Sequence, residues 1–145
     1  METRVSALTS FFFAPVARPT SRRAVLAWWE SRRPVYNLCV GAAGLLTLAA
    51  AYGFGALPPY PAVVRVPWQI VALYAVMANV CYSAGPLADL WARRAGGERW
   101  AVVGPTIFRY GFVFAVGVTL LPIVAAAGSW GVRVLIALTG GALPP

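Results

Sequence analysis

The chain contains no histidine and only four acidic residues among its 145. Zinc, haem and most transition metals prefer imidazole or thiolate ligands, so the absence of histidine removes the commonest of these ligands. The two cysteines, Cys39 and Cys81, form no CxxC pair, and we expect both to pack as small apolar residues. The sequence therefore predicts no catalytic residues, no metal and no cofactor, and we expect that the protein is not an enzyme.

Lysine is also absent, so all 12 basic residues are arginines and the net charge is +8. A positive balance can indicate nucleic acid as a partner. Here, however, the arginines flank apolar stretches, which is typical of the positive-inside rule and of contact with anionic lipid head groups. We therefore expect a bilayer with anionic head groups on the cytoplasmic side as a partner, and no nucleic acid.

What the chain has in abundance is apolar side chains. Hydrophobic residues make up 60% of it, charged residues only 11%, and the mean hydropathy is +0.72. Three nearly charge-free stretches cover about residues 35–57, 67–90 and 105–127. A stretch of 23 residues gives roughly 34 Å of helix, enough for a hydrocarbon core of about 30 Å. The sequence predicts an all-α integral membrane bundle with three transmembrane helices, over residues 34–127.

Residues 1–33 are expected to form a cytoplasmic or interfacial segment that contains an amphipathic helix. Thr20 or Ser21 offers an N-cap to the run that follows. Glu30 is expected to pair with Arg33 or with an adjacent arginine. Tryptophan, tyrosine and arginine are enriched in the head-group layer. On that basis the predicted membrane-interface residues are Trp28, Trp29, Arg32, Arg33 and Tyr36.

Residues 128–145 are apolar but short. Gly128 and Ser129 interrupt the pattern of the third stretch, and the remainder also contains Arg133. A segment of this length is too short to span comfortably. We expect a short C-terminal apolar helix that lies on the surface or re-enters the membrane. A fourth tilted span, giving four spans in all, is the alternative.

The arginines also predict the orientation. Six of them precede the first span and three lie between the second and third, whereas only Arg65 lies between the first and second. Three spans with a cytoplasmic N-terminus place nine of these arginines inside and one outside, and Arg133 then lies outside. The expected location is the bacterial inner membrane, as a multi-pass protein.

Two predicted spans carry stripes of small and polar residues at steps of three and four, which places each stripe on one helix face. The stripe of the second span is Ala72, Ala75, Asn79, Tyr82, Pro86, Asp89 and Arg93. The stripe of the first span is Asn37, Gly41, Gly44, Leu48, Ala51 and Gly55. Small residues let helix backbones approach closely, and lipid offers no hydrogen bonds. Helix packing within one bundle is predicted; a ligand or pore lining from Asn79 and Tyr82, or docking onto another membrane protein, are alternatives.

Arg109 lies four residues after Pro105, at the expected start of the third span. A charge at the centre of a bilayer costs at least ~2.5 kcal/mol, but this side chain can extend to the nearby surface. Asp89 is expected at a similar level, so the sequence predicts an Asp89–Arg109 ion pair that holds helices together. A proton relay would need a carboxylate deep in the membrane, and no acidic residue is expected there.

The most distinctive strings are residues 28–37, which read WWESRRPVYN, and residues 79–85, which read NVCYSAG. They resemble small uncharacterised bacterial membrane proteins with W-E-x-R-R-x-x-Y-N before the first span and N-x-x-Y-x-x-G in a later one. Leu121–Pro122 is similar to the end of the last span in such proteins. The resemblance covers much of the membrane region, implies no known activity, and favours four spans.

The expected function is that of a non-enzymatic accessory, assembly or structural subunit that docks onto a larger membrane-protein complex. Other membrane protein subunits, or further copies of the chain, are the expected protein partners. An oligomeric small transporter or channel is the alternative, although such proteins usually need a carboxylate within the membrane. A lipid-modifying enzyme would depend on arginines and on Tyr36 or Tyr82. Contact with a pigment or quinone stays open, with any ligation supplied by a partner chain.

Overall fold

All regular elements in the described part of the chain are helices. The computed structural model describes residues 2–14, 21–100 and 103–140. In chain order the elements are α1 (Glu2–Phe13), α2 (Arg22–Glu30), α3 (Arg33–Ala56), α4 (Trp68–Gly96), the short 3-10 turn η1 (Gly97–Trp100) and α5 (Val103–Leu138). The all-α prediction is confirmed.

Three helical segments are long and apolar enough to cross a membrane. They are Arg22–Ala56, Trp68–Gly96 and Val103–Leu138, with mean hydropathies of 1.7, 1.5 and 2.1 over their most apolar windows. Only a small share of the residues in these apolar stretches is buried within the protein, so most of their apolar surface is exposed. The prediction of three spans is confirmed, and the protein is a small multi-span membrane protein.

Local sequence accounts for most helix boundaries. The Ser21 hydroxyl accepts the Ala24 N–H at 3.1 Å and caps α2, as expected of one of the two predicted N-caps. Pro34 occupies the first turn of α3, where its missing N–H costs nothing. The irregular loop from residue 57 to residue 67 contains Pro58, Pro59 and Pro61, which cannot donate helical hydrogen bonds.

The predicted break after residue 127 is wrong. The last helix, α5, continues without interruption through Gly128 and Ser129 to Leu138, so a separate short C-terminal helix does not form. Contacts with another element hold this extension. The Trp130 indole N–H donates to the Pro58 carbonyl at 3.0 Å, and the Arg133 guanidinium donates to carbonyls at the end of α3. No fourth span occurs within the described ranges, which end at residue 140.

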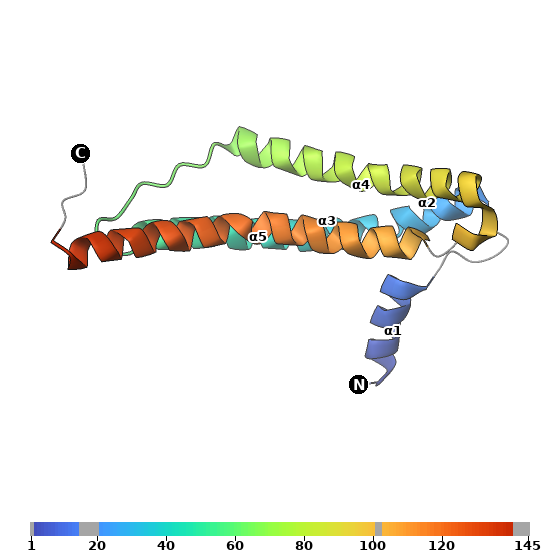
Figure 1. Cartoon of the computed structure of the whole chain (residues 1–145), viewed down its shortest axis with the longest axis horizontal. Helices are drawn as coiled ribbons and strands as arrows, with labels where there is room; N and C mark the ends of the chain where they lie inside the picture. Colours follow the sequence, from blue (N-terminus) through green and yellow to red (C-terminus); the bar gives the residue numbers. More distant parts are fainter. Residues whose placement is uncertain (1, 15–20, 101–102, 141–145) are drawn as a thin grey trace.

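The long helices form a pair with a third helix beside it (Figure 1). Helices α3 and α5 pack against each other along most of their length. Helix α4 approaches them closely only at its C-terminal half, where α2 also packs against it. Helix α1 runs across the direction of the long helices, and its Phe12 ring stacks on Phe108 of α5 at 5.9 Å between centroids. This crosswise orientation suits a helix lying along a membrane surface.

The N-terminal half of α4 packs little against the other described elements. All ten residues from 68 to 77 are exposed. Tyr74 nevertheless connects this half of α4 to α5, because its hydroxyl forms a hydrogen bond of 2.5 Å with the Thr119 hydroxyl. Arg133 follows Thr119 by 14 residues, or about 21 Å of helix, whereas Trp68 precedes Tyr74 by only six residues, or about 9 Å. Helix α4 therefore begins well short of the far end of the α3–α5 pair.

Candidate functional site

The single aspartate, Asp89, is fully buried. It lies at the end of the bundle where α3 begins and α4 ends, which we call the arginine-rich end because it carries Arg32, Arg33, Arg93 and Arg94. Its Oδ2 atom accepts the Trp29 indole N–H at 3.1 Å, and its Oδ1 atom accepts Arg93 Nε at 2.7 Å. Asp89 is 0% exposed, and Arg93 is its i+4 neighbour on α4. The carboxylate thereby joins α2 to α4, through one neutral and one charged donor.

The predicted Asp89–Arg109 pair does not form; the ion pair found for Asp89 is with Arg93. Asp89 points at the first turn of α5, where it contacts Gly104 so closely that a Cβ atom at that position would overlap its carboxylate. Arg109 follows Gly104 by five residues and therefore projects about 140° away around the helix. Its guanidinium lies over the Phe13 ring instead, 4.4 Å from the centroid.

An aromatic cluster surrounds Trp29. The Tyr82 hydroxyl donates to the Trp29 carbonyl at 2.6 Å, and the Tyr36 and Tyr82 rings lie 4.6 Å apart between centroids. Gly85 touches the indole, because a Cβ atom there would lie 2.5 Å from a ring carbon. The Tyr36 hydroxyl donates to the Ala78 carbonyl at 3.1 Å. The two distinctive strings of the sequence, residues 28–37 and 79–85, are therefore packed against each other.

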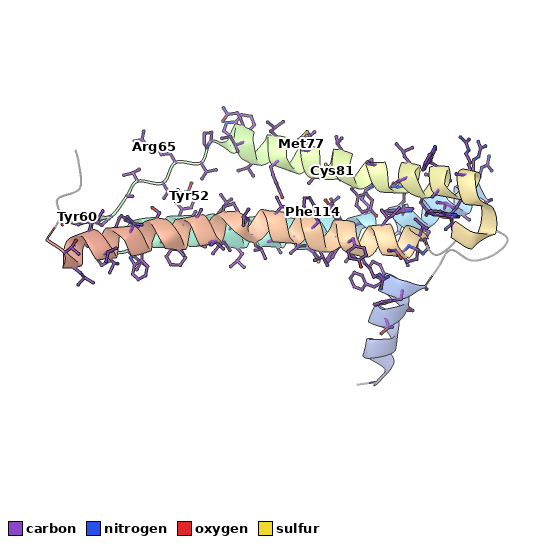
Figure 2. The ribbon with its side chains drawn as sticks, viewed as in Figure 1. Tyr52, Tyr60, Arg65, Met77, Cys81 and Phe114 are labelled. Atoms are coloured by element: carbon purple, nitrogen blue, oxygen red, sulfur yellow. The ribbon has the colours of Figure 1, made fainter. Side chains whose placement is uncertain are left out.

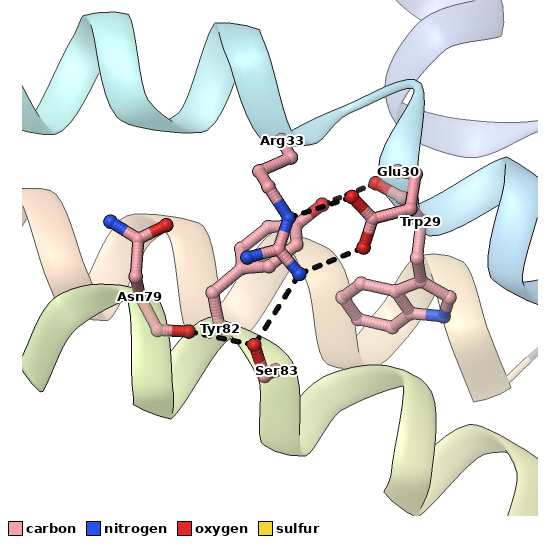
Figure 3. A network of polar contacts seen from close by, with 6 residues as sticks. All are labelled: Trp29, Glu30, Arg33, Asn79, Tyr82 and Ser83. Carbon is pink, nitrogen blue, oxygen red and sulfur yellow. Dashed lines mark hydrogen bonds and ion pairs between the residues drawn. The ribbon is translucent and has the colours of Figure 1, made fainter. Parts of the chain in front are cut away.

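The predicted Glu30–Arg33 pair is confirmed and connects this cluster to α4. Both carboxylate oxygens of Glu30 accept guanidinium N–H groups of Arg33 at 2.8 Å. The same guanidinium donates to the Ser83 hydroxyl at 3.3 Å and lies over the Tyr82 ring, 4.8 Å from its centroid. Figure 3 shows Arg33 reaching from α3 across to α4 between Glu30 and Ser83.

Most of the predicted interface residues face protein. Trp29, Tyr36 and Arg32 are 2%, 3% and 7% exposed. Arg32 donates from Nε to the Phe11 carbonyl at 2.9 Å, and its guanidinium lies 3.7 Å from the Trp28 ring centroid. Their depth in a bilayer stays a prediction, but these side chains are buried where α1, α2, α3 and α4 meet.

The stripe on α4 divides into two halves. Tyr82, Pro86 and Asp89 are buried within the chain, whereas Ala72 and Ala75 are exposed. Between the two halves lies Asn79, which is half-buried.

The stripe on α3 divides in the opposite sense. Gly55, at its far end, is buried under the loop, whereas Asn37 and Gly41 are exposed and Gly44 is half-buried. Asn37, Gly41 and Gly44 of α3 line the same space as Ala75 and Asn79 of α4.

That space is a groove of about 400 Å³ between α3 and α4, which we call the α3–α4 groove. Its lining includes Asn37, Val40, Gly41, Gly44, Leu45, Thr47, Leu48, Ile70, Val71, Tyr74, Ala75, Ala78, Asn79, Val118, Thr119 and Pro122. No acidic or basic side chain contributes to this lining. The amides of Asn37 and Asn79 lie at the arginine-rich end of the groove, and the hydroxyl groups of Thr47, Tyr74 and Thr119 lie in its middle.

The two amides have unused hydrogen-bonding capacity. Asn79 donates from Nδ2 to the Ala75 carbonyl of its own helix at 3.1 Å, and the structure shows no partner for its Oδ1 among the described residues. Asn37 makes no side-chain hydrogen bond to any described residue. Figure 3 shows the Asn79 amide extending from α4 toward the side on which α3 lies. Beside them, Gly41 has no atom within 4 Å of the position a Cβ would take.

A second groove, of about 430 Å³, lies between α4 and α5. Met77 and Cys81 of α4 and Phe114 of α5 contribute to it (Figure 2). Its tyrosines already use their hydroxyl groups, since Tyr36 donates to Ala78, Tyr82 to Trp29, and Tyr74 pairs with Thr119. This groove therefore offers apolar contact alone, whereas the α3–α4 groove also offers amides.

Arg133 is a structural residue that sequence reasoning missed. It is 8% exposed and donates to the carbonyls of Gly55, Tyr60 and Phe54, with 2.6 Å to Tyr60. These carbonyls belong to the end of α3 and the loop that follows, so Arg133 closes this end of the bundle. No local signal could identify partners more than 70 residues away.

Comparison of the chain with protein-family models, with curated proteins and with solved structures gives no match. Within the part of the chain that the structure describes, no three histidine, cysteine or acidic side chains gather as a group that could hold a metal ion.

Proposed function

We propose that this protein is a non-enzymatic accessory or assembly subunit of a larger membrane-protein complex. In this proposal the α3–α4 groove receives a transmembrane helix of the complex. The observation that carries it is the set of small and polar residues on α3 and α4 that line this groove and are exposed or half-buried within the described part of the chain.

Membrane physics favours a protein occupant over lipid. Acyl chains cannot hydrogen-bond an amide, and small side chains at a helix surface allow a second backbone to approach. The groove combines both features, because Asn37 and Asn79 lie beside Gly41, Gly44 and Ala75. A helix that lies in it gains close packing from the small residues and polar contacts from the amides.

The same proposal places the protein in the bacterial inner membrane with a cytoplasmic N-terminus. Support comes from the arginines, which are concentrated before the first span and between the second and third. The soluble parts are short, and the buried Asp89 is held by Trp29 and Arg93 at the end of a helix. Neither feature favours catalysis or a proton pathway through the membrane.

The test is affinity purification from native membranes in mild detergent, followed by mass spectrometry of stoichiometric partners. The informative variant is Gly41→Leu, because a Cβ at this position meets no atom within 4 Å and the larger side chain occupies the groove. The matched control is Gly53→Leu in the same helix. A Cβ at this position also meets no atom within 4 Å, but Gly53 does not line the groove. We expect wild type and Gly53→Leu to retain the partner complex and Gly41→Leu to lose it.

A wild-type protein that purifies alone, as a monomer or homo-oligomer, would overturn the proposal. Retention of the partner by Gly41→Leu would also overturn the assignment of the groove. In the first case, flux measurements in liposomes would test the transporter alternative.

A further inference from the structure

We infer that the partner helix carries a side-chain amide, of asparagine or glutamine, at the depth of Asn37 and Asn79. The inference rests on the proposed function, since it names the chemistry of the helix that the α3–α4 groove receives. It is drawn from the level and the unused atoms of the two asparagines, and from the lack of charged side chains in the groove lining.

Both amides lie at one level of the bundle. Arg33 of α3 donates a hydrogen bond to Ser83 of α4 at 3.3 Å, so these two residues lie at the same level of the bundle. Asn37 follows Arg33 by four residues, and Asn79 precedes Ser83 by four, so each amide lies about 6 Å further into the membrane region. The occupant must therefore present its polar group about one helical turn inside its own charged boundary.

The unused atoms include donors and acceptors. The free Asn37 amide offers both, and the Asn79 Oδ1 atom offers an acceptor. A hydroxyl can accept but has a single donor, so it can donate to only one of the two Oδ1 atoms, whereas an amide has two donors and an acceptor and can donate to both. An amide is thus the side chain that can satisfy both asparagines at once.

Charge argues against an ionised partner. The groove lining holds no charged side chain, and the guanidinium of Arg33, four residues before Asn37, is already bound to both oxygens of Glu30 at 2.8 Å. A carboxylate or ammonium of the partner would lose its hydration with no opposite charge to receive it, which is costly at membrane depth. A neutral amide avoids this cost.

The experiment uses leucine-rich transmembrane peptides with arginine at both ends and an acceptor dye. One peptide has a single asparagine one turn inside one end, a matched peptide has it at the centre, and a third has none. The full-length protein carries a donor dye at its N-terminus, and energy transfer in liposomes reports binding. We expect the first peptide to bind about tenfold more tightly than the other two, as a buried interhelical hydrogen bond allows.

The protein variants are Asn37→Leu/Asn79→Leu and the control Gln69→Leu. Gln69 is another exposed amide on α4 that does not line the groove. The double variant should bind all three peptides equally, and the control should behave as wild type. Both asparagines lie outside the buried core, so an unchanged circular dichroism spectrum is expected to verify folding.

Equal binding of the three peptides to wild-type protein would overturn the inference. Preference for the first peptide that persists in the double variant would overturn it as well. Self-association of labelled copies that depends on the same asparagines would show that a second copy supplies the amide, and it would overturn the separate partner subunit of the proposed function. If the peptide assay overturns the inference but Gly41→Leu still loses the native complex, the proposed function stands.

Discussion

Single residues at the arginine-rich end show why burial decides the value of an ion pair. The Asp89–Arg93 and Glu30–Arg33 pairs have similar geometry, with N–O distances of 2.7 and 2.8 Å. Their surroundings differ, because the Asp89 side chain is 0% exposed and the Glu30 side chain 55% exposed. Exposed pairs contribute about 0–1 kcal/mol, whereas removing one partner of a buried pair leaves an uncompensated charge.

We therefore predict a large difference between Asp89→Asn and Glu30→Gln. An asparagine can still accept the Trp29 N–H, but it cannot also receive Arg93 as a carboxylate does. The free energy of unfolding in detergent should fall by about 2 kcal/mol or more for Asp89→Asn. It should fall by at most ~1 kcal/mol for Glu30→Gln. Unfolding in mixed micelles, followed by far-ultraviolet circular dichroism, measures both; equal losses would contradict this account.

Residue partners show where sequence reasoning reaches its limit. The Glu30–Arg33 pair was predictable because three residues separate its members on a helical path. The Asp89–Arg109 pair was predicted wrongly because only the similar level of the two residues was considered, and not the rotation of α5 about its axis. The contact of Asp89 with Gly104 determines that rotation, and it is a property of how two helices meet rather than of either sequence.

At the scale of elements, hydropathy was sufficient to predict the number of spans but not the length of α5. Gly128 and Ser129 are typical of a helix end in isolation, and a buried arginine near the end of an apolar run favours a surface segment. Carbonyl oxygens of α3 and its loop satisfy Arg133 and make a continuous helix favourable. Such contacts between distant elements are not encoded in local pattern, whereas the N-cap at Ser21 and the proline-rich loop are.

The joint between α5 and the loop can be tested by Arg133→Gln. Glutamine has fewer donors and a shorter reach, so part of the carbonyl set is left unpaired, at about 2 kcal/mol. The Ala62 amide, which donates to Gly55 at 2.8 Å, should then exchange with solvent on the order of 30-fold faster. Hydrogen exchange with mass spectrometry measures this.

The control for that experiment is Arg65→Gln in the same loop. Arg65 is exposed and projects away from the helices (Figure 2), so its replacement should leave exchange at Ala62 unchanged. The role given to Arg133 would be wrong if both variants exchanged alike.

At the scale of the whole molecule, the arginines of α5 indicate how the bundle crosses the membrane. Arg109 and Arg133 are separated by 24 residues, or about 36 Å of helix, slightly more than a hydrocarbon core of about 30 Å. Each can therefore lie near one boundary. The Tyr74–Thr119 hydrogen bond then lies near the middle of the membrane, and the α3–α4 groove, which both residues line, faces the membrane interior.

This placement predicts opposite sides for the two ends of the described chain. In a background with Cys39 and Cys81 replaced by alanine, the exposed positions Ala95, Val63 and Thr139 can each be changed to cysteine. A membrane-impermeant maleimide should label Val63→Cys and Thr139→Cys in intact cells, and Ala95→Cys only after permeabilisation, because the proposed orientation has the arginine-rich side in the cytoplasm. Labelling of Thr139→Cys together with Ala95→Cys would require an even number of spans. Exchange of the whole pattern would invert the orientation and leave the three-span fold in place.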